Sequence, residues 1–203
     1  MTGVKEFTLA LCQLKVTEDL EFNLAKAALF VERAKASNAD LVLLPEMFAC
    51  PYEDQWFTAL AEVEGGPVYQ ALKHMSQGIL LVGGSHPEKE GNNLYNTCYS
   101  FEDGVLLGKY RKINLFNVQY DGMTYHESAT LSPGEECCIL HSRLGVIALA
   151  ICFDLRFPAL FQELEKANPF LYLLPAAFNQ VSGPLHYKLL GQARALDQES
   201  YLA

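Results

Sequence analysis

Two stretches of the chain share a pattern that few folds can accommodate. Residues 41–48 read "LVLLPEMF" and residues 171–178 read "LYLLPAAF". In each, an apolar run ends at a proline and a phenylalanine follows at the same spacing, which is typical of a buried strand and the turn after it. The repeat predicts two similar structural units. Among the positions that differ, one changes a charge, because the position of Glu46 in the first stretch is occupied by Ala176 in the second.

The segments around both stretches predict a strand, a helix and a second strand in each unit. Continuous apolar strands that alternate with amphipathic helices indicate a sheet covered by helices, as in α/β proteins. Thr17 is expected to cap the first helix. The predicted ranges are 7–14, 17–37 and 39–46 in the first unit, and 145–155, 157–168, 169–179 and a further helix over 183–200 in the second.

The segment between the two units is richer in β-structure. Residues 78–86 predict a strand, and residues 93–116 predict a hairpin around an "EDG" turn. Residues 118–136 are polar and contain turn residues, so they predict a long loop, and such loops inside a domain are usually functional. Because no low-complexity linker interrupts the chain, we expect a single α/β domain over residues 1–203.

The charge balance and the cysteines exclude several classes of protein. The net charge of −9 argues against nucleic acid and anionic membranes as partners, since both require a basic surface. No apolar stretch approaches the roughly 20 residues of a membrane-spanning helix. The N-terminus lacks a secretory signal pattern, so we expect a cytoplasmic protein with six reduced cysteines. None of these cysteines has zinc-ligand spacing, and we expect neither a metal nor an organic cofactor.

Reactive side chains follow three of the predicted strands. Glu46 follows the strand before Pro45, Cys152 follows the run 145–151, and Lys112 lies at the far end of the hairpin. A thiol, a carboxylate and an ammonium group together can transfer an acyl group, as nucleophile, general base and oxyanion stabiliser. Taken singly, each residue has a structural interpretation. Cys152 fits a packed core cysteine, Glu46 fits a helix cap or a salt-bridge partner, and Lys112 fits a solvated basic run.

The combination of motifs resembles one family. The order "LLPEMF", "KYRKINLF", "HESATLSPG" and "AICFDLRFP" resembles the nitrilase superfamily of carbon–nitrogen hydrolases over nearly the whole chain. The resemblance implies an α–β–β–α sandwich of the nitrilase type with two pseudo-symmetric halves. It also implies Glu46 as general base and acid, Lys112 as oxyanion stabiliser and Cys152 as nucleophile. Glu127 would help to position Lys112, and the backbone N–H of Phe153 would complete the oxyanion hole.

The local sequences are most similar to the omega-amidase branch of this family, which hydrolyses the terminal amide of 2-oxoglutaramate and 2-oxosuccinamate. The branch resemblance places Arg156 against the substrate carboxylate, and Phe178 and Ser182 in the same pocket. We also expect Tyr52 to contact the substrate. The alternative for Arg156 is a structural ion pair with Asp154 or a nearby carboxylate. Alternative substrates are deaminated glutathione and N-carbamoyl compounds.

The resemblance has one departure, at the C-terminus. Family members usually continue beyond the position of Ala203, so a C-terminal part of the sandwich is expected to be missing. A truncated, inactive relative that acts as an interaction module is therefore the alternative from another functional class. For an active enzyme, the resemblance implies a small amide as substrate and a homodimer or higher homo-oligomer as the assembly.

Overall fold

The computed structural model describes residues 6–120, 123–178 and 183–203. Its first sheet has six strands in the order β1-β2-β3-β5-β4, with β6 paired to β5. The strands β1, β2 and β3 are parallel, and β5 runs antiparallel to its three neighbours. The bounds are β1 Leu9–Leu11, β2 Leu41–Leu43, β3 Leu80–Val82, β4 His86–Glu90, β5 Asn93–Glu102 and β6 Val105–Arg111.

The second sheet has four strands in the order β12-β11-β10-β9. Strands β10, β11 and β12 are parallel, and β9 is antiparallel to β10. The bounds are β9 Cys138–Ser142, β10 Gly145–Leu149, β11 Leu171–Leu173 and β12 Tyr201–Leu202. The predicted repeat is confirmed by these pairings, because β1 and β2 pair in parallel in the first half as β10 and β11 do in the second.

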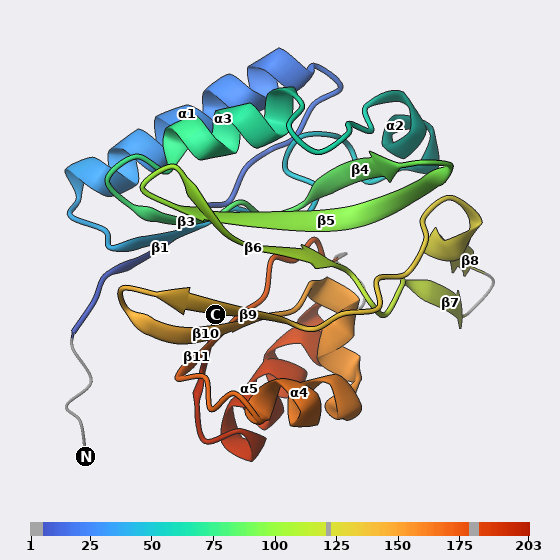
Figure 1. Ribbon diagram of the computed structural model, residues 1–203. Coiled ribbons are helices and arrows are strands. Elements are labelled where there is room, and N and C mark those ends of the chain that lie inside the picture. The colour runs from blue at the N-terminus through green and yellow to red at the C-terminus, as the bar shows by residue number, and fades with distance from the viewer. Residues whose placement is uncertain (1–5, 121–122, 179–182) are drawn as a thin grey trace.

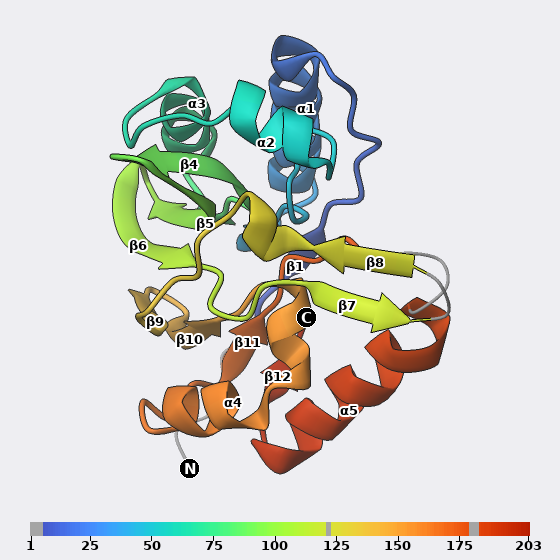
Figure 2. The same cartoon turned by 90° about the vertical axis from the view of Figure 1, so that its right-hand side faces the viewer.

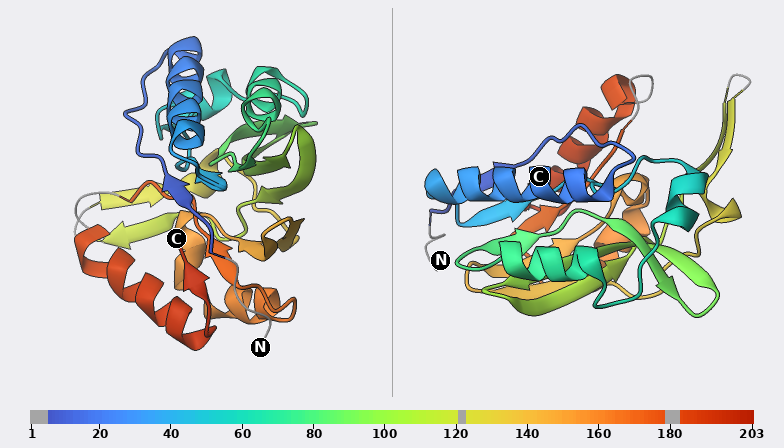
Figure 3. Two further views of the ribbon diagram at one scale, coloured as in Figure 1. Left: turned by 90° about the vertical axis from the view of Figure 1, so that its left-hand side faces the viewer. Right: turned by 90° about the horizontal axis from the view of Figure 1, so that it is seen from above.

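Helices cover the outer face of each sheet (Figure 1). Helices α1 and α3 lie side by side over the first sheet, and α4 and α5 lie against the second (Figures 1 and 3). The short helix α2 lies near the end of β4 (Figure 1). The bounds are α1 Leu20–Ala36, α2 Asp54–Ala59, α3 Pro67–Met75, α4 Pro158–Glu165 and α5 Lys188–Asp197.

Three apolar cores hold these four layers together. The central core lies between the two sheets, where Leu43 and Val82 of the first sheet pack with Leu149 and Leu173 of the second. A second core joins α1 and α3 to the first sheet, and a third joins α4 to the second sheet. Side chains of each sheet therefore enter two different cores, which explains why the strands read as continuous apolar runs rather than as alternating ones. The order of layers is α–β–β–α, as expected.

The sequence predictions were wrong or incomplete at several elements. Residues 118–136 do not form a plain loop, because they contain the hairpin of β7 (Asn117–Tyr120) and β8 (Met123–His126). This hairpin extends beyond the edges of both sheets (Figure 2). The first helix begins at Leu20, and its cap is the Asp19 carboxylate, which accepts the Phe22 N–H at 3.0 Å, rather than Thr17.

The second unit also differs in detail from its predicted ranges. Strand β10 ends at Leu149, and residues Cys152–Arg156 form a 3₁₀ helix instead of continuing the strand. The predicted helix over 183–200 begins with a π-helical turn, Gly183–Tyr187, before α5. Helices α2 and α3 and strands β4 and β9 were not predicted. Strand β4 carries the polar pattern "HPEKE", which gives no apolar periodicity to detect.

His86 on β4 makes the stability of the fold depend on pH. Its side chain is 1% exposed, and Nδ1 has no hydrogen-bond partner among the described residues. Burial lowers the pKa of His86 to about 4; Glu88 opposes this shift and Lys109 reinforces it. The unfolded chain therefore binds the proton at higher pH than the folded one. Neutral His86 therefore stabilises the fold above the ordinary histidine pKa of 6.5, and this stabilisation is lost as pH falls from 6.5 toward 4.

We expect acidification from pH 7.5 to 4.5 to reduce the free energy of unfolding by about 2–3 kcal/mol through His86 alone. Urea unfolding of the wild type and of His86→Asn at both pH values measures this contribution as the difference between the two proteins. If both proteins lose the same stability on acidification, the neutral buried imidazole is not the cause.

Candidate active site

Lys112 forms the centre of a buried cluster of charges. Its side chain is fully buried, and Nζ lies 2.9 Å from the Glu46 carboxylate and 3.0 Å from that of Glu127. Both carboxylates are also buried, with Glu46 2% exposed and Glu127 fully buried. A buried charge is tolerated only where it is paired and hydrogen-bonded, so these three groups depend on one another.

The three side chains come from the ends of different strands. Glu46 lies in the turn after β2, Lys112 directly follows β6, and Glu127 opens a 3₁₀ helix after β8. Main-chain hydrogen bonds fix these positions: the Lys112 N–H donates to the Asn96 carbonyl at 2.9 Å, and the Glu127 N–H donates to the Phe116 carbonyl at 3.1 Å. The hairpin β7–β8, which the sequence did not predict, returns the chain so that Glu127 meets Lys112.

Two uncharged side chains complete the cluster. The Tyr52 hydroxyl donates to Glu127 Oε1 at 2.8 Å and accepts from Lys112 Nζ at 3.2 Å. The Asn96 amide donates to Glu46 Oε1 at 2.9 Å and to Glu127 Oε1 at 3.3 Å. Tyr52 was predicted as a substrate contact, and the structure places it against the charged residues. Asn96 was not predicted, since an asparagine inside a β-strand carries no motif of its own.

The electrostatics of the cluster keep Lys112 charged. Burial alone would lower the pKa of Lys112, but the charges of Glu46 and Glu127 outweigh it and raise the pKa above its ordinary value. Burial, followed by the same two carboxylates, also raises the pKa of Tyr52 well above its usual range. The cluster therefore holds an ammonium group and a neutral phenol at neutral pH.

Cys152 lies at a turn with unusual backbone geometry. Its φ is +46°, a region that non-glycine residues rarely adopt, and its side chain is 9% exposed. The Cys152 N–H donates to the Pro175 carbonyl at 2.9 Å, so the proline of the second repeat stretch supports the turn of the thiol. Strained backbone of this kind persists only where the surroundings enforce it, and it is frequent at functional sites.

Asp154 is the residue that enforces this turn. It is fully buried, and its carboxylate accepts the Ile151 N–H at 2.8 Å, the Tyr110 hydroxyl at 2.7 Å and the Asn114 backbone and side-chain N–H groups at 2.8 Å. Tyr110 belongs to β6 and Asn114 follows Lys112 by two residues. The same carboxylate thus ties the turn of Cys152 to the segment that carries Lys112. The alternative of an ion pair between Asp154 and Arg156 is wrong in the structure, because no such pair is present among the described residues.

The Cys152 thiol and the Glu46 carboxylate lie together. Burial raises the pKa of Cys152 well above its usual range, and the Glu46 charge and a hydrogen bond to Glu46 raise it further. Lys112 and a hydrogen bond from the Ala177 N–H lower it but do not reverse the shift. Cys152 is therefore a thiol at neutral pH, with the carboxylate positioned to accept its proton. The expectation that Glu46 lies near Cys152 and away from bulk solvent agrees with this arrangement.

Phe153 offers a backbone N–H directly after the nucleophile position. The hydrogen bonds of the neighbouring N–H groups are made by Cys152 to Pro175 and by Asp154 to Ile151. Within the described residues, no acceptor is present for the Phe153 N–H. A free donor at this point is what an oxyanion hole requires.

A pocket of about 400 Å³ opens beside Glu46 at the carboxyl ends of the parallel strands. Ligands in α/β proteins commonly bind at such strand ends. Phe178 forms part of its wall, as expected, and its ring lies 4.8 Å from that of Tyr187. Tyr187 was not predicted as a site residue. It lies in the π-helical turn Gly183–Tyr187, which the structure reveals and the sequence pattern does not.

Arg156 lies at the end of the 3₁₀ helix that begins with Cys152. One terminal guanidinium nitrogen is 2.8 Å from Nδ1 of His186, and the guanidinium carbon is 5.5 Å from the centre of the Phe153 ring. Its Nε is buried without a hydrogen-bond partner, and no carboxylate pairs with Arg156 in the described part of the chain. Ser182, which was also predicted to bind substrate, lies outside the described residues.

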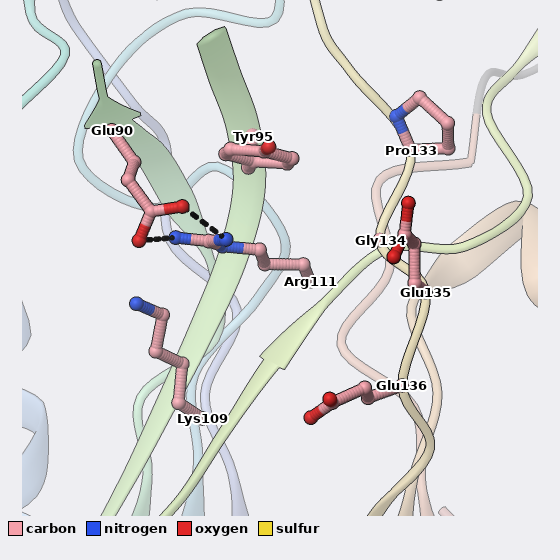
Figure 4. A pocket seen from close by; sticks show the side chains of 8 residues that line it. All are labelled: Glu90, Tyr95, Lys109, Arg111, Pro133, Gly134, Glu135 and Glu136. Carbon is pink, nitrogen blue, oxygen red and sulfur yellow. Dashed lines mark hydrogen bonds and ion pairs between the residues drawn. The ribbon is translucent and has the colours of Figure 1, made fainter.

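A larger pocket, of about 490 Å³, lies away from this cluster. It is lined by Tyr95, Lys109 and Arg111 on one side and by Gly134, Glu135 and neighbouring residues on the other (Figure 4). Arg111 is paired with Glu88 and Glu90, and Lys109 with Glu64. Both cations of this pocket are already paired, whereas the smaller pocket is lined by Glu46 of the charged cluster, so the smaller pocket is the better candidate for a reaction.

The described residues offer neither a metal site nor a membrane-spanning helix. Over residues 6–120, 123–178 and 183–203, no three His, Cys, Asp or Glu side chains are grouped as ligands for a metal ion. None of the helices in these ranges combines the length and the apolar composition that a membrane crossing requires. All six cysteines are free thiols, and only Cys137 is exposed.

Comparisons with known proteins agree with the geometry. Residues 8–203 match the family model for carbon–nitrogen hydrolases. The chain is 41% identical to an omega-amidase of Arabidopsis thaliana described as chloroplastic, over 98% of this chain and 56% of the relative. It is 40% identical to the omega-amidase NIT2 of Homo sapiens, over 97% of this chain and 73% of that protein. The chain thus spans little more than half of the first relative and about three quarters of the second.

A solved structure shares the fold over nearly the whole chain. The crystal structure of Saccharomyces cerevisiae Nit3, a member of branch 10 of the nitrilase superfamily, superposes with a TM-score of 0.85. The two sequences are 37% identical over 96% of this chain and 73% of the yeast protein. With the family model matched from residue 8 to residue 203, the chain belongs to the carbon–nitrogen hydrolases of the nitrilase superfamily, a family of amide-hydrolysing enzymes.

Proposed function

We propose that the protein is a cysteine-dependent amidase that hydrolyses a linear carboxamide to a carboxylate and ammonia through a thioester. The observation that carries this proposal is the meeting of the Cys152 thiol with the Glu46 carboxylate beside a fully buried Lys112. A structural cysteine has no need of a base and a cation in contact with it. Glu127 and Tyr52 hold Lys112 from the other side.

In the first step, the Cys152 sulfur attacks the amide carbonyl carbon while its proton moves to Glu46. Because the pKa of Cys152 is raised, the resting group is the thiol, and proton removal accompanies attack rather than preceding it. The charge of the carboxylate moves to the carbonyl oxygen of the tetrahedral intermediate. Lys112 stays protonated throughout, as its raised pKa requires.

The oxyanion would be stabilised by Lys112 and by the free N–H of Phe153. In the resting enzyme the three Lys112 protons face Glu46, Glu127 and the Tyr52 oxygen. The phenol oxygen is the only uncharged acceptor of the three. An oxyanion is a stronger acceptor than a phenol, so it can replace Tyr52 at 3.2 Å without breaking either ion pair.

The second half of the reaction regenerates the enzyme. The carbon–nitrogen bond breaks as Glu46 returns its proton to the leaving nitrogen, which gives ammonia and a thioester on Cys152. Glu46 then takes a proton from water, whose oxygen attacks the thioester, and the proton returns to the sulfur as the carboxylic acid leaves. The sum is one amide and one water converted to one carboxylic acid and one ammonia, with no cofactor.

The substrate class is proposed to be an amide that carries a carboxylate, as in 2-oxoglutaramate and 2-oxosuccinamate. Two relatives named omega-amidase, at 41% and 40% identity, support this choice. Arg156 supports it as well, because its Nε is buried without an acceptor in the described residues and a guanidinium group binds carboxylates in a bidentate fork. Deaminated glutathione and N-carbamoyl amino acids are the alternatives within the family.

We also propose an oligomeric state and a location in the cell. A homodimer or larger homo-oligomer would cover exposed apolar side chains on and next to α5, where Leu185, Leu189 and Leu196 are 64%, 65% and 78% exposed. A cytoplasmic location is proposed, and the six free cysteines are compatible with a reducing compartment. The relative from Arabidopsis thaliana is described as chloroplastic.

Replacement of the nucleophile should abolish the activity without unfolding the protein. We expect Cys152→Ala to reduce ammonia release from 2-oxoglutaramate by roughly 10³-fold or more. A glutamate dehydrogenase-coupled assay measures the ammonia, and Cys12→Ala, a buried cysteine outside the cluster, is the matched control. Full activity in Cys152→Ala would end the proposal. A folded wild type that neither releases ammonia nor forms an adduct on Cys152 with an electrophilic amide would favour the interaction module instead.

Replacement of Arg156 should separate substrates by charge. We expect Arg156→Ala to lower kcat/KM for 2-oxoglutaramate on the order of 10²-fold, because a charge-assisted bidentate pair is lost. A neutral amide of similar length should change only a few-fold. Initial rates with both substrates test this, and an equal loss on both would show that Arg156 supports the fold of the site rather than the carboxylate.

A further inference from the structure

Asn96 contacts both carboxylates of the cluster, and the mechanism above assigns it no role. It lies on β5, is fully buried, and donates its two side-chain N–H bonds to Glu46 Oε1 at 2.9 Å and Glu127 Oε1 at 3.3 Å. Its main-chain carbonyl accepts the Lys112 N–H at 2.9 Å. One residue therefore touches the main chain of the lysine and the side chains of both acids.

The orientation of the Asn96 amide is fixed by its surroundings. Its Oδ1 is buried without a donor in the described part of the chain. Rotation of the amide by 180° would direct this oxygen at two carboxylates and replace two attractive contacts with two repulsive ones. The buried oxygen without a partner is the cost of placing both N–H bonds on the acids.

The charge of the site explains why a neutral donor is suited to this position. Two carboxylates and one ammonium group leave one net negative charge in a buried space. A second cation would neutralise the charge that Glu46 needs as a base, and an acidic residue would add repulsion. An amide stabilises both carboxylates and leaves the net charge of the site unchanged.

The two oxygens of Glu46 are not equivalent. Oε1 accepts from Lys112 at 2.9 Å and from Asn96 at 2.9 Å, which uses the two lone pairs of a carboxylate oxygen. Oε2 accepts only the Ala177 N–H, at 3.0 Å, among the described residues. Pro175, two residues before Ala177, accepts the Cys152 N–H at 2.9 Å. Oε2 therefore keeps one lone pair available among the described residues, and it lies on the side of Cys152.

We propose that Asn96 is a positioning residue that, together with Lys112, saturates Oε1 of Glu46 and assigns proton transfer to Oε2. The proton of the Cys152 thiol passes to Oε2, and from Oε2 to the leaving nitrogen. Asn96 contacts neither substrate nor sulfur and acts through Glu46. The proposal rests on the proposed amidase function and adds to it the atom that carries the proton.

The test is the pH dependence of Asn96→Ala. Loss of two N–H donors favours the protonated form of the carboxylates. We therefore expect kcat/KM for 2-oxoglutaramate to fall roughly 10- to 100-fold at pH 7 and the acid limb of its pH profile to move up by about one pH unit. The rate of Cys152 alkylation by iodoacetamide should show the same displacement. The other ionisable groups that face the site are Lys112, Glu127, Tyr52 and Cys152, and all of them remain in the variant.

Two further variants keep the outcome interpretable. Asn23→Ala is the matched control, because Asn23 is also buried and bonds the Thr17 and Ala49 carbonyls at 2.6 and 3.0 Å without touching the cluster. We expect Asn23→Ala to lower the free energy of unfolding and to leave the acid limb of the pH profile in place. If Asn96→Ala does not fold, Asn96→Ser, which keeps one donor, should show a smaller displacement in the same direction. An acid limb unchanged in a folded Asn96 variant overturns the proposal.

Failure of this proposal can be distinguished from failure of the amidase function. An inactive Cys152→Ala together with an unmoved acid limb in Asn96→Ala rejects the role of Asn96 and keeps the amidase. Activity in Cys152→Ala rejects the amidase and with it the proton path.

Discussion

The site depends on one buried interaction, the ion pairs of Lys112 with Glu46 and Glu127. An ammonium group without solvent contact is stable only if carboxylates surround it, and each carboxylate in turn requires the lysine. Removal of Lys112 would leave two buried carboxylates without a counter-ion, and removal of either carboxylate would leave Lys112 with a single ion pair. The surrounding donors, Tyr52 and Asn96, are satisfied by the same acids, so they depend on this pairing as well.

The layered fold brings these groups together because the two sheets share one core. Strands β2 and β10 belong to different sheets, yet their side chains pack in the same central cluster. Their carboxyl ends therefore lie at the same edge, where Glu46 follows one strand and Cys152 the other. In the segment after β11, the Pro175 carbonyl accepts the main-chain N–H of Cys152 and the Ala177 N–H donates to the Glu46 carboxylate. The second repeat stretch thus supplies main-chain contacts at the position where the first supplies a side chain.

The thiol and the lysine are linked a second time, through Asp154. Its carboxylate accepts hydrogen bonds from both the Cys152 turn and the segment around Lys112. This link fixes a backbone conformation with φ of +46° that a cysteine would not adopt alone. The turn of Cys152 and the segment of Lys112 are therefore held in place by one buried anion.

Local sequence patterns predicted the repeated strand–helix–strand units, the buried strands and the reactive residues Glu46, Lys112 and Cys152, because apolar periodicity and local motifs are properties of short segments. It did not determine the polar strand β4 or the hairpin β7–β8 that delivers Glu127, since neither has an apolar pattern. The contacts of Asn96, Asp154 and Tyr52 became visible in the folded structure alone. Apart from the bond between Ile151 and Asp154, their side-chain hydrogen bonds join residues 31 to 75 positions apart, and no local pattern encodes a contact that exists only after the two sheets have packed.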